Sequence, residues 1–239
     1  MFPQNEIILS LTRILKARSP VKLINNYKGV PIHYDAVILE VAEREATFKV
    51  HPYQCVGLKL DQQTFIQSEG IEYSVRANLK SVDFVAKIAV LEDFLYAPDT
   101  IGSRAAIRVQ PEHAVDVVIL SRNRKIPGQL ADISMVGMGI YSFSAYIDNP
   151  AFIKRGISVT VVLALHEVNG FEDITLKGII QNMAREGDVY RLGIRTNPAD
   201  TAQRIMNEYI DSRKQEVLRE IEDTYQQVFQ LSFHDEGLA

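Results

Sequence analysis

Six residues near the middle of the chain combine types and spacings that suit the binding of a nucleotide. They are Arg104, Arg108, Asp132, Ser134, Gly137 and Gly139. A guanidinium group is planar and permanently charged, so it holds a phosphate through two parallel hydrogen bonds and also stacks on a purine ring. A carboxylate accepts hydrogen bonds from N1 and N2 of guanine, a donor pair that adenine lacks. Together these residue types indicate a pocket for a guanine nucleotide.

Each of these residues has an expected role, and each also has a simpler explanation. The two arginines lie in a segment that could wrap a ligand, and Ser134 is expected to donate to a phosphate oxygen. Gly137 and Gly139 would let the chain turn sharply and let a ring approach the backbone, because glycine has no Cβ. The alternative is that the arginines form a solvated edge and that Asp132 caps a plain turn.

The elements before these residues are predicted to be mostly strands. A short amphipathic helix is expected first, because Ile7, Leu11 and Ile14 share one helical face and Ser19-Pro20 ends it. Runs rich in β-branched and aromatic residues follow without intervening helices, which favours an antiparallel barrel or sandwich. These runs are VKLIN, YDAVILEVA, ATFKV, TFIQS, IEYSVRANL and SVDFVAKIAVL.

A second group of strands follows a predicted domain boundary at residues 98–102, where the strand pattern lapses. Arg122, Arg124 and Lys125 are expected in a solvated loop, because Asn123 and the nearby Pro127-Gly128 indicate a hairpin tip. From Pro198 onward, apolar residues recur at helical spacing over more than about thirty residues. The strand runs of this part are RVQPEHAVDVVIL, KIPGQLADIS, GMGIYSF, ISVTVVLAL, FEDITLKGIIQNM and VYRLGIRT.

The predicted fold class is therefore mainly β. We expect two consecutive small antiparallel β-barrels, with a short N-terminal helix and a long C-terminal helix. The predicted domains are residues 1–98, 99–198 and 199–239. The end of the last segment could cover a barrel, dock on an effector or form a homodimer with a second copy.

Composition narrows the classes of partner. The net charge is −4, and most of the acidic excess lies after residue 198, so no basic stripe for a nucleic-acid polymer is expected. No apolar run approaches the roughly 18 residues that span a bilayer, so no membrane insertion is expected. Glu6 and Arg13 interrupt the first segment, which argues against a signal peptide. These features, with a single cysteine, favour a cytoplasmic location.

Catalytic and metal-binding residues are not predicted. The five histidines are scattered, and none is spaced from another as metal ligands usually are. Cys55 could act as a nucleophile only beside a histidine, and a small buried apolar residue is the favoured interpretation. We therefore expect a binding protein without a cofactor and not an enzyme.

The joint pattern R-x-x-x-R, then 23 residues, then D-x-S-x-x-G resembles the signature of the PilZ domain. The strand VYRLGIRT before a helix is similar to the last strand of that domain. The first part of the chain, with its leading helix and YDAVILEV, resembles the β-barrel that precedes PilZ in flagellar-brake-type proteins. The PilZ family binds the bacterial second messenger cyclic di-GMP.

The resemblance implies roles for the six residues. Arg104 and Arg108 would contact phosphates and guanines, Asp132 would bind a guanine edge, and Ser134 and Gly137 would line the pocket. Ser103 stands where some family members have a further arginine and bind a stacked ligand pair, which favours one cyclic di-GMP per domain.

The same resemblance implies that the chain is a receptor acting through a protein effector, such as a flagellar motor component or a polysaccharide synthase. Its output would be motility, biofilm or exopolysaccharide. The alternative is a protein-interaction barrel with a vestigial pocket.

Overall fold

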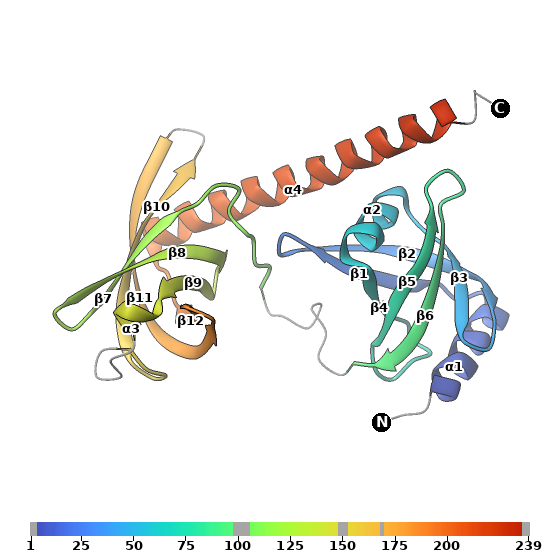
Figure 1. Cartoon of the computed structure of the whole chain (residues 1–239), viewed down its shortest axis with the longest axis horizontal. Coiled ribbons are helices and arrows are strands. Elements are labelled where there is room, and N and C mark those ends of the chain that lie inside the picture. The colour runs from blue at the N-terminus through green and yellow to red at the C-terminus, as the bar shows by residue number, and fades with distance from the viewer. Residues whose placement is uncertain (1–3, 98–105, 148–152, 168–169, 236–239) are drawn as a thin grey trace. The chain divides into compact units, whose positions relative to one another are not determined.

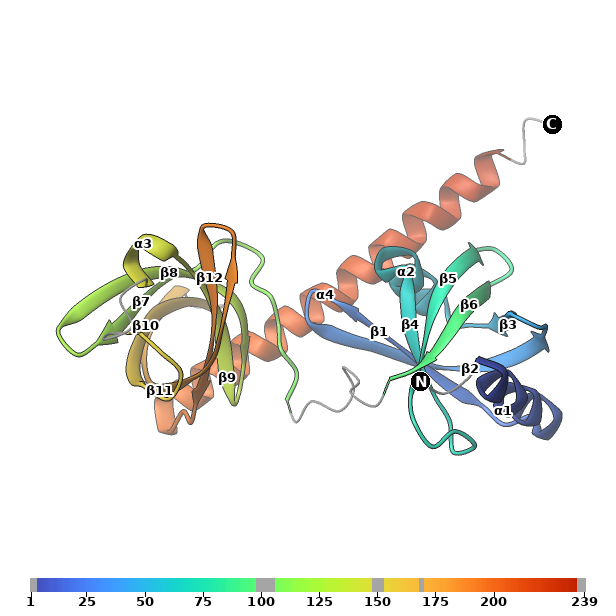
Figure 2. The same cartoon turned by 60° about the horizontal axis from the view of Figure 1, so that its bottom comes forward.

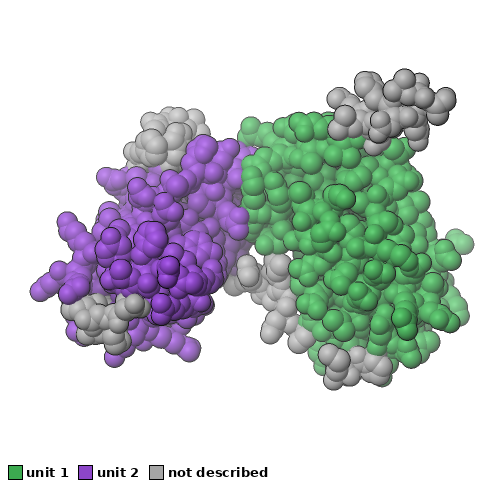
Figure 3. Space-filling model, in the orientation of Figure 1, with its two compact units in different colours: residues 1–105, 217–239 green, residues 106–216 purple. Residues whose placement is uncertain are grey.

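The computed structural model of the chain describes residues 4–97, 106–147, 153–167 and 170–235. Within these ranges the chain forms two closed antiparallel barrels, each with six strands, together with helices near both ends (Figure 1). This architecture confirms the predicted fold class. The chain divides into two compact units, one of residues 1–105 with 217–239 and the other of residues 106–216 (Figure 3).

The first barrel closes because its first strand pairs with both the second and the fourth. The strand order around the barrel is β1-β2-β3-β6-β5-β4. Buried and exposed positions alternate along most of its strands, as a sheet with one face on a core requires. Its strands are β1 (Val21–Tyr27), β2 (Val30–Val41), β3 (Glu45–Lys49), β4 (Gln63–Gln67), β5 (Val75–Asp83) and β6 (Ile88–Tyr96).

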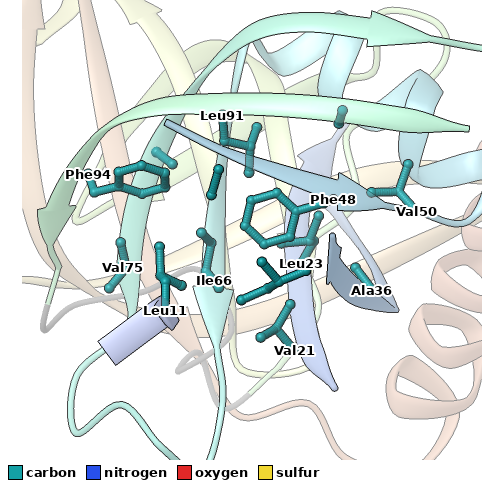
Figure 4. Close-up of a cluster of buried hydrophobic side chains, with 14 of the residues drawn as sticks. Leu11, Val21, Leu23, Ala36, Phe48, Val50, Ile66, Val75, Leu91 and Phe94 are labelled. Atoms are coloured by element: carbon teal, nitrogen blue, oxygen red, sulfur yellow. The ribbon is translucent and has the colours of Figure 1, made fainter. Parts of the chain in front are cut away.

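Helix α1 (Gln4–Ala17) supplies part of the core of this barrel. Its buried side chains are Ile7, Leu11 and Ile14, the face predicted from the sequence. Figure 4 shows Leu11 in one cluster with core side chains of the strands, including Phe48 and Phe94. The apolar face of α1 is therefore held by burial in a barrel core.

Helix α2 (Pro52–Asp61) was not predicted, and the expectation of strands without intervening helices was wrong here. His51 caps its N-terminus by accepting a hydrogen bond from the backbone N–H of Tyr53 at 3.2 Å. Gly57 allows the helix to approach β1, since a Cβ there would lie 3.2 Å from the Cβ of Asn25. Histidine is an uncommon cap, so the usual capping residue is missing from the sequence, and the start signal of Pro52 in the first turn was overlooked.

The run SVDFVAKIAVL is not a single strand as predicted. Residues 84–87 form a turn that separates β5 from β6. The Asp83 carboxylate accepts from the backbone N–H groups of Val85 and Ala86, so this side chain stabilises the turn. The apolar residues continue through this turn, so the sequence pattern did not indicate the hairpin between β5 and β6.

The second barrel has the strand order β10-β11-β12-β9-β8-β7. The turn between β7 and β8 lies at Arg122 and Asn123, where a hairpin tip was predicted, and Pro127 and Gly128 lie inside β8. Its strands are β7 (Asp116–Ser121), β8 (Arg124–Ser134), β9 (Gly137–Phe143), β10 (Ser158–Glu167), β11 (Gly170–Glu186) and β12 (Val189–Thr196). The short helix α3 (Ser144–Ile147) follows β9.

The C-terminal helix α4 (Asp200–Asp235) has 36 residues, as the long apolar repeat predicted. Figure 2 shows it as one continuous ribbon. Its residues 200–216 belong to the unit of the second barrel, and its later residues belong to the unit of the first. Among the described helices, none combines the length and apolar character needed to cross a membrane.

The later part of α4 is held in the first unit by aromatic rings. The ring of Tyr225 lies 6.4 Å from that of Tyr53, 6.5 Å from that of Phe84 and 5.6 Å from that of Phe229. Glu220, one turn earlier, forms an ion pair with Lys28. This apolar face is thus covered within the same chain, and self-association through it stays a prediction.

His51 makes the stability of the first unit depend on pH. Burial, and then the positive charge of Lys87, lower the pKa of His51. Its ring stacks on Tyr34 at 3.8 Å, and its Nδ1 must be unprotonated to accept from Tyr53. The unfolded chain therefore binds this proton more readily, so stability is full above the unfolded pKa of about 6.5 and is lost as pH falls toward the lower folded value.

We expect the free energy of unfolding of the full chain to fall more between pH 7.5 and 5.5 in the wild type than in His51→Asn. Asparagine caps helices well and does not titrate, so it removes this pH-dependent contribution. It also removes the stack on Tyr34, and the comparison therefore uses the difference between the two pH values within each protein. Urea denaturation at both pH values measures the difference. Equal pH dependence in the two proteins would contradict the role given to His51.

Candidate functional site

Asp132 lies on the outer face of the second barrel. It pairs with Gly139 on β9, and Gly139 pairs with Gly193 on β12, so the three residues form a row across the sheet. Cross-strand partners point to the same side, and the neighbouring Ile140 and Leu192 are buried in the barrel. Although Asp132 points outward, it is only 7% exposed.

Arg108 is brought to Asp132 by the segment that enters the barrel. Val109 and Ile133 form an isolated bridge in which each backbone N–H donates to the other's carbonyl at 2.9 Å. One residue earlier, Nη1 of Arg108 lies 3.4 Å from Oδ1 of Asp132. The structure thus brings together two residues predicted for the site that are far apart in sequence.

Arg191 is a site residue that the sequence analysis did not single out. It lies on β12, and its Nη2 donates to Oδ2 of Asp132. Its position in the sequence could have indicated this role, because Arg191 lies two residues before Gly193 and side chains two residues apart in a strand share one face. The strand VYRLGIRT was noted as a whole, but strand alternation alone does not show which neighbour an exposed arginine meets.

The glycines have packing roles in the structure without any ligand. A Cβ on Gly139 would lie 2.9 Å from Oδ2 of Asp132, so the carboxylate occupies the space that a side chain would need. A Cβ on Gly137 would lie 2.4 Å from the carbonyl oxygen of Ile194 on the neighbouring strand. Both positions therefore require glycine for close approach within the barrel.

Ser134 closes the turn between β8 and β9. Its Oγ donates to the carbonyl of Gly137 at 2.9 Å, and the side chain is fully buried. A hydroxyl has one hydrogen and two lone pairs. The sequence analysis expected Ser134 to donate to a phosphate oxygen. To do so, its hydroxyl would first have to break the hydrogen bond to the carbonyl of Gly137.

Arg104 lies outside the described residues, so its predicted contacts are not tested. The other five predicted residues lie on β8, on β9 or in the segment before β7. The carboxylate of Asp132 lies against Arg108 and Gly139. The adjacent turn contains Ser134 and Gly137. Exposed aromatic residues, Tyr141 and Phe143, continue along β9.

This cluster can bind a molecule that has both hydrogen-bond donors, for the carboxylate, and a negative charge, for the guanidinium groups. Asp132 supplies a buried acceptor, and its two arginines are partly exposed, with side-chain exposures of 37% for Arg108 and 40% for Arg191. Exposed guanidinium edges can bind phosphate oxygens. The 3.4 Å contact of Arg108 is long for a hydrogen bond, so this arginine is the one more readily exchanged.

Comparisons with known proteins concern the whole chain. No protein-family model matches the sequence, and no curated protein matches it. Similar solved structures include a MrkH-c-di-GMP complex from K. pneumonia, 15% identical, covering 91% of this chain and 97% of that one, with a TM-score of 0.45.

Two further similar structures come from Escherichia coli. YcgR in complex with c-di-GMP is 16% identical over 92% of this chain and 96% of that one, with a TM-score of 0.44. The PilZ domain of YcgR with c-di-GMP is 20% identical over 50% of this chain and 98% of that one, with a TM-score of 0.40. At these identities and TM-scores the likeness carries no argument about function, which depends on the geometry of the site.

We expect Arg191→Ala to destabilise the protein by about 1 kcal/mol, because a buried carboxylate loses a charge-assisted hydrogen bond while water screens the exposed guanidinium. Urea denaturation measures the loss. Arg185→Ala removes an exposed arginine from the neighbouring strand β11 and is the matched control. Arg185 has local contacts of its own, with the carbonyl of Gly187 and the ring of Tyr190, so the test is the coupling and not the single-variant loss. A double-mutant cycle with Asp132→Asn should show coupling for Arg191 and none for Arg185; equal coupling energies for both arginines would refute the contact.

Proposed function

We propose that the chain is a receptor for cyclic di-GMP and that its second barrel holds the ligand on its outer face. The observation that supports this most directly is the buried carboxylate of Asp132 beside two partly exposed arginines, over a strip of glycines. A guanine edge needs a paired acceptor, and a phosphodiester needs cations. The cluster offers both on one face.

In the proposed binding step, guanine N1–H and N2–H donate to Asp132. Oδ1 is the more available oxygen, because Arg108 contacts it at 3.4 Å, while Arg191 holds Oδ2 over Gly139. Arg108 then turns to a phosphate, and Arg191 keeps the buried carboxylate neutralised. Arg104 supplies a second cation from the entering segment. One ligand per barrel and no further cofactor are proposed.

The ligand's effect would pass along the entering segment to α4. Gln110 follows the Val109 bridge, and its carbonyl accepts from Nε of Arg213 on α4 at 3.0 Å. Arg213 is 3% exposed, so this contact is sheltered from water. Since later residues of α4 belong to the unit of the first barrel, a ligand that moves Arg108 would act on how the two units are arranged.

We propose that this rearrangement controls a protein effector in the cytoplasm, such as a flagellar motor component or a polysaccharide synthase. Motility, biofilm or exopolysaccharide production would be the output. A homodimer through α4 is a second mode of assembly to be tested. A barrel with a vestigial pocket would bind partners without the nucleotide.

Isothermal titration of the full chain with cyclic di-GMP and cyclic di-AMP tests the ligand. Only cyclic di-GMP should bind tightly. Arg108→Ala should weaken binding at least about tenfold, because charge-assisted hydrogen bonds contribute roughly 1.5 to 3 kcal/mol. Asp132→Asn should lower the ratio of the affinities for cyclic di-GMP and cyclic di-AMP, while the arginines still attract the phosphates of both ligands. Equal binding of cyclic di-AMP, or an unchanged affinity in Arg108→Ala, would refute the proposal.

Distances between labels on the two units test the rearrangement. Burial raises the pKa of the Cys55 thiol to about 11, so maleimide labels should react at introduced cysteines and spare this one. Glu43→Cys places a label in an exposed bend of the first barrel, and Glu186→Cys places one at the exposed end of β11 in the second. Saturating cyclic di-GMP should change the distance, and an added Asp132→Asn change should abolish the response. An unchanged distance in the saturated protein would mean that the ligand acts through a local surface.

A further inference from the structure

The outer face of the second barrel carries a hollow of about 880 Å³ in addition to the Asp132 cluster. It lies over the end of β7, the start of β10, the middle of β11 and the end of β12. The pairings Thr160 with Lys177 and Ser158 with Ile179 place these side chains on one sheet face. The lining residues that carry the argument are Arg122, Val136, Lys177, Ile179 and Arg195.

Three cations surround this hollow. Arg122 lies in the turn after β7, Lys177 on β11 and Arg195 on β12, and all three are exposed. Within the described part of the chain, none of them has an ion pair with an acidic residue, and no acidic residue lines the hollow. For a chain of net charge −4, this is a local concentration of uncompensated positive charge.

The hydroxyl of Thr196 does not belong to this cationic face. Thr196 follows Arg195 on β12, pairs with Gly178 and is 5% exposed, so its side chain points to the opposite face of the sheet. Its Oγ1 is buried, so the cations and the exposed apolar side chains are the groups that a ligand in the hollow can reach.

One wall of the hollow is apolar and includes an exposed side chain, while Ser158, Thr160 and Asn197 add polar groups elsewhere in the lining. Val136 is 48% exposed, and Ile179 and Leu120 also contribute to the lining. The backbone N–H of Thr196 donates to the carbonyl of Val136 at 3.1 Å, which ties this wall to β12. Cations beside an apolar wall suit an organic anion better than a bare inorganic ion.

We propose that this hollow binds a small phosphorylated molecule with an apolar or aromatic part. Arg122, Lys177 and Arg195 bind the phosphate, and Val136 and Ile179 pack against the apolar part. Val136 lies in the turn that Ser134 and Gly137 form, but the cations of the hollow are not those that neutralise Asp132, so the proposal does not depend on the function proposed for cyclic di-GMP.

Phenyl phosphate is the probe, and methyl-labelled isoleucine and valine signals of the full chain are the readout by NMR. We expect saturable shifts at Val136 and Ile179. Lys177→Ala should weaken binding about tenfold, the loss of one charge-assisted contact. Arg185→Ala removes one exposed charge from the same strand and is the matched control. Arg122→Ala, in an exposed turn, provides a second test should Lys177→Ala fold poorly.

Several outcomes would overturn the proposal. Equal weakening in Lys177→Ala and Arg185→Ala would show a nonspecific charge effect, and phenol binding as tightly as phenyl phosphate would show that the cations do not contribute. Shifts confined to residues around Gly139 would place the probe at the other site. Cosedimentation with phosphatidylglycerol vesicles that is lost in Lys177→Ala, without phenyl phosphate binding, would assign the cations to a lipid surface.

Discussion

A buried carboxylate on an outer barrel face must be neutralised, and this requirement organises the second unit. An ionised aspartate without partners would cost several kcal/mol to bury. Arg191 reaches Asp132 from the last strand, and Arg108 reaches it from the entering segment. The carboxylate of Asp132 therefore connects the last strand of the barrel, through Arg191, with the segment that enters the barrel, through Arg108. A ligand that uses Asp132 must leave at least one of these cations in place.

The glycine strip belongs to the same constraint. The carboxylate lies against β9 only because Gly139 has no Cβ, and Gly137 avoids the carbonyl of Ile194 for a similar reason. Glycines that would admit a ligand ring are also the ones that let three strands and a carboxylate pack closely. Packing and recognition thus require the same residue type, and substitution there would affect both.

Helix α4 contributes to both units through different chemistry. Arg213 contacts the backbone of Gln110 in the second unit, and Tyr225 packs among aromatic rings in the first. The polar contact is specific in geometry, whereas the aromatic cluster relies mainly on buried area. A change at the entering segment therefore reaches the helix through a directional bond, and the helix is retained in the first unit by a broad apolar surface.

The sequence alone determined the fold class and pointed to residues that the structure brings together. Runs rich in β-branched and aromatic residues predicted both barrels, and the apolar repeat after Pro198 predicted α4. The types and spacing of Arg108, Asp132 and Gly139 indicated a shared pocket, and its ligand stays a prediction. These signals are local, because the composition and spacing of apolar residues in a strand or a helix can be recognised within a short stretch of sequence.

Tertiary structure decided what local patterns do not encode. The contact of Arg191 with Asp132 depends on β12 pairing with β9, the hydroxyl of Ser134 is used by its own turn, and α2 begins at an unusual histidine cap. Contacts between strands far apart in sequence depend on register, and register is settled only when the whole barrel closes around its core.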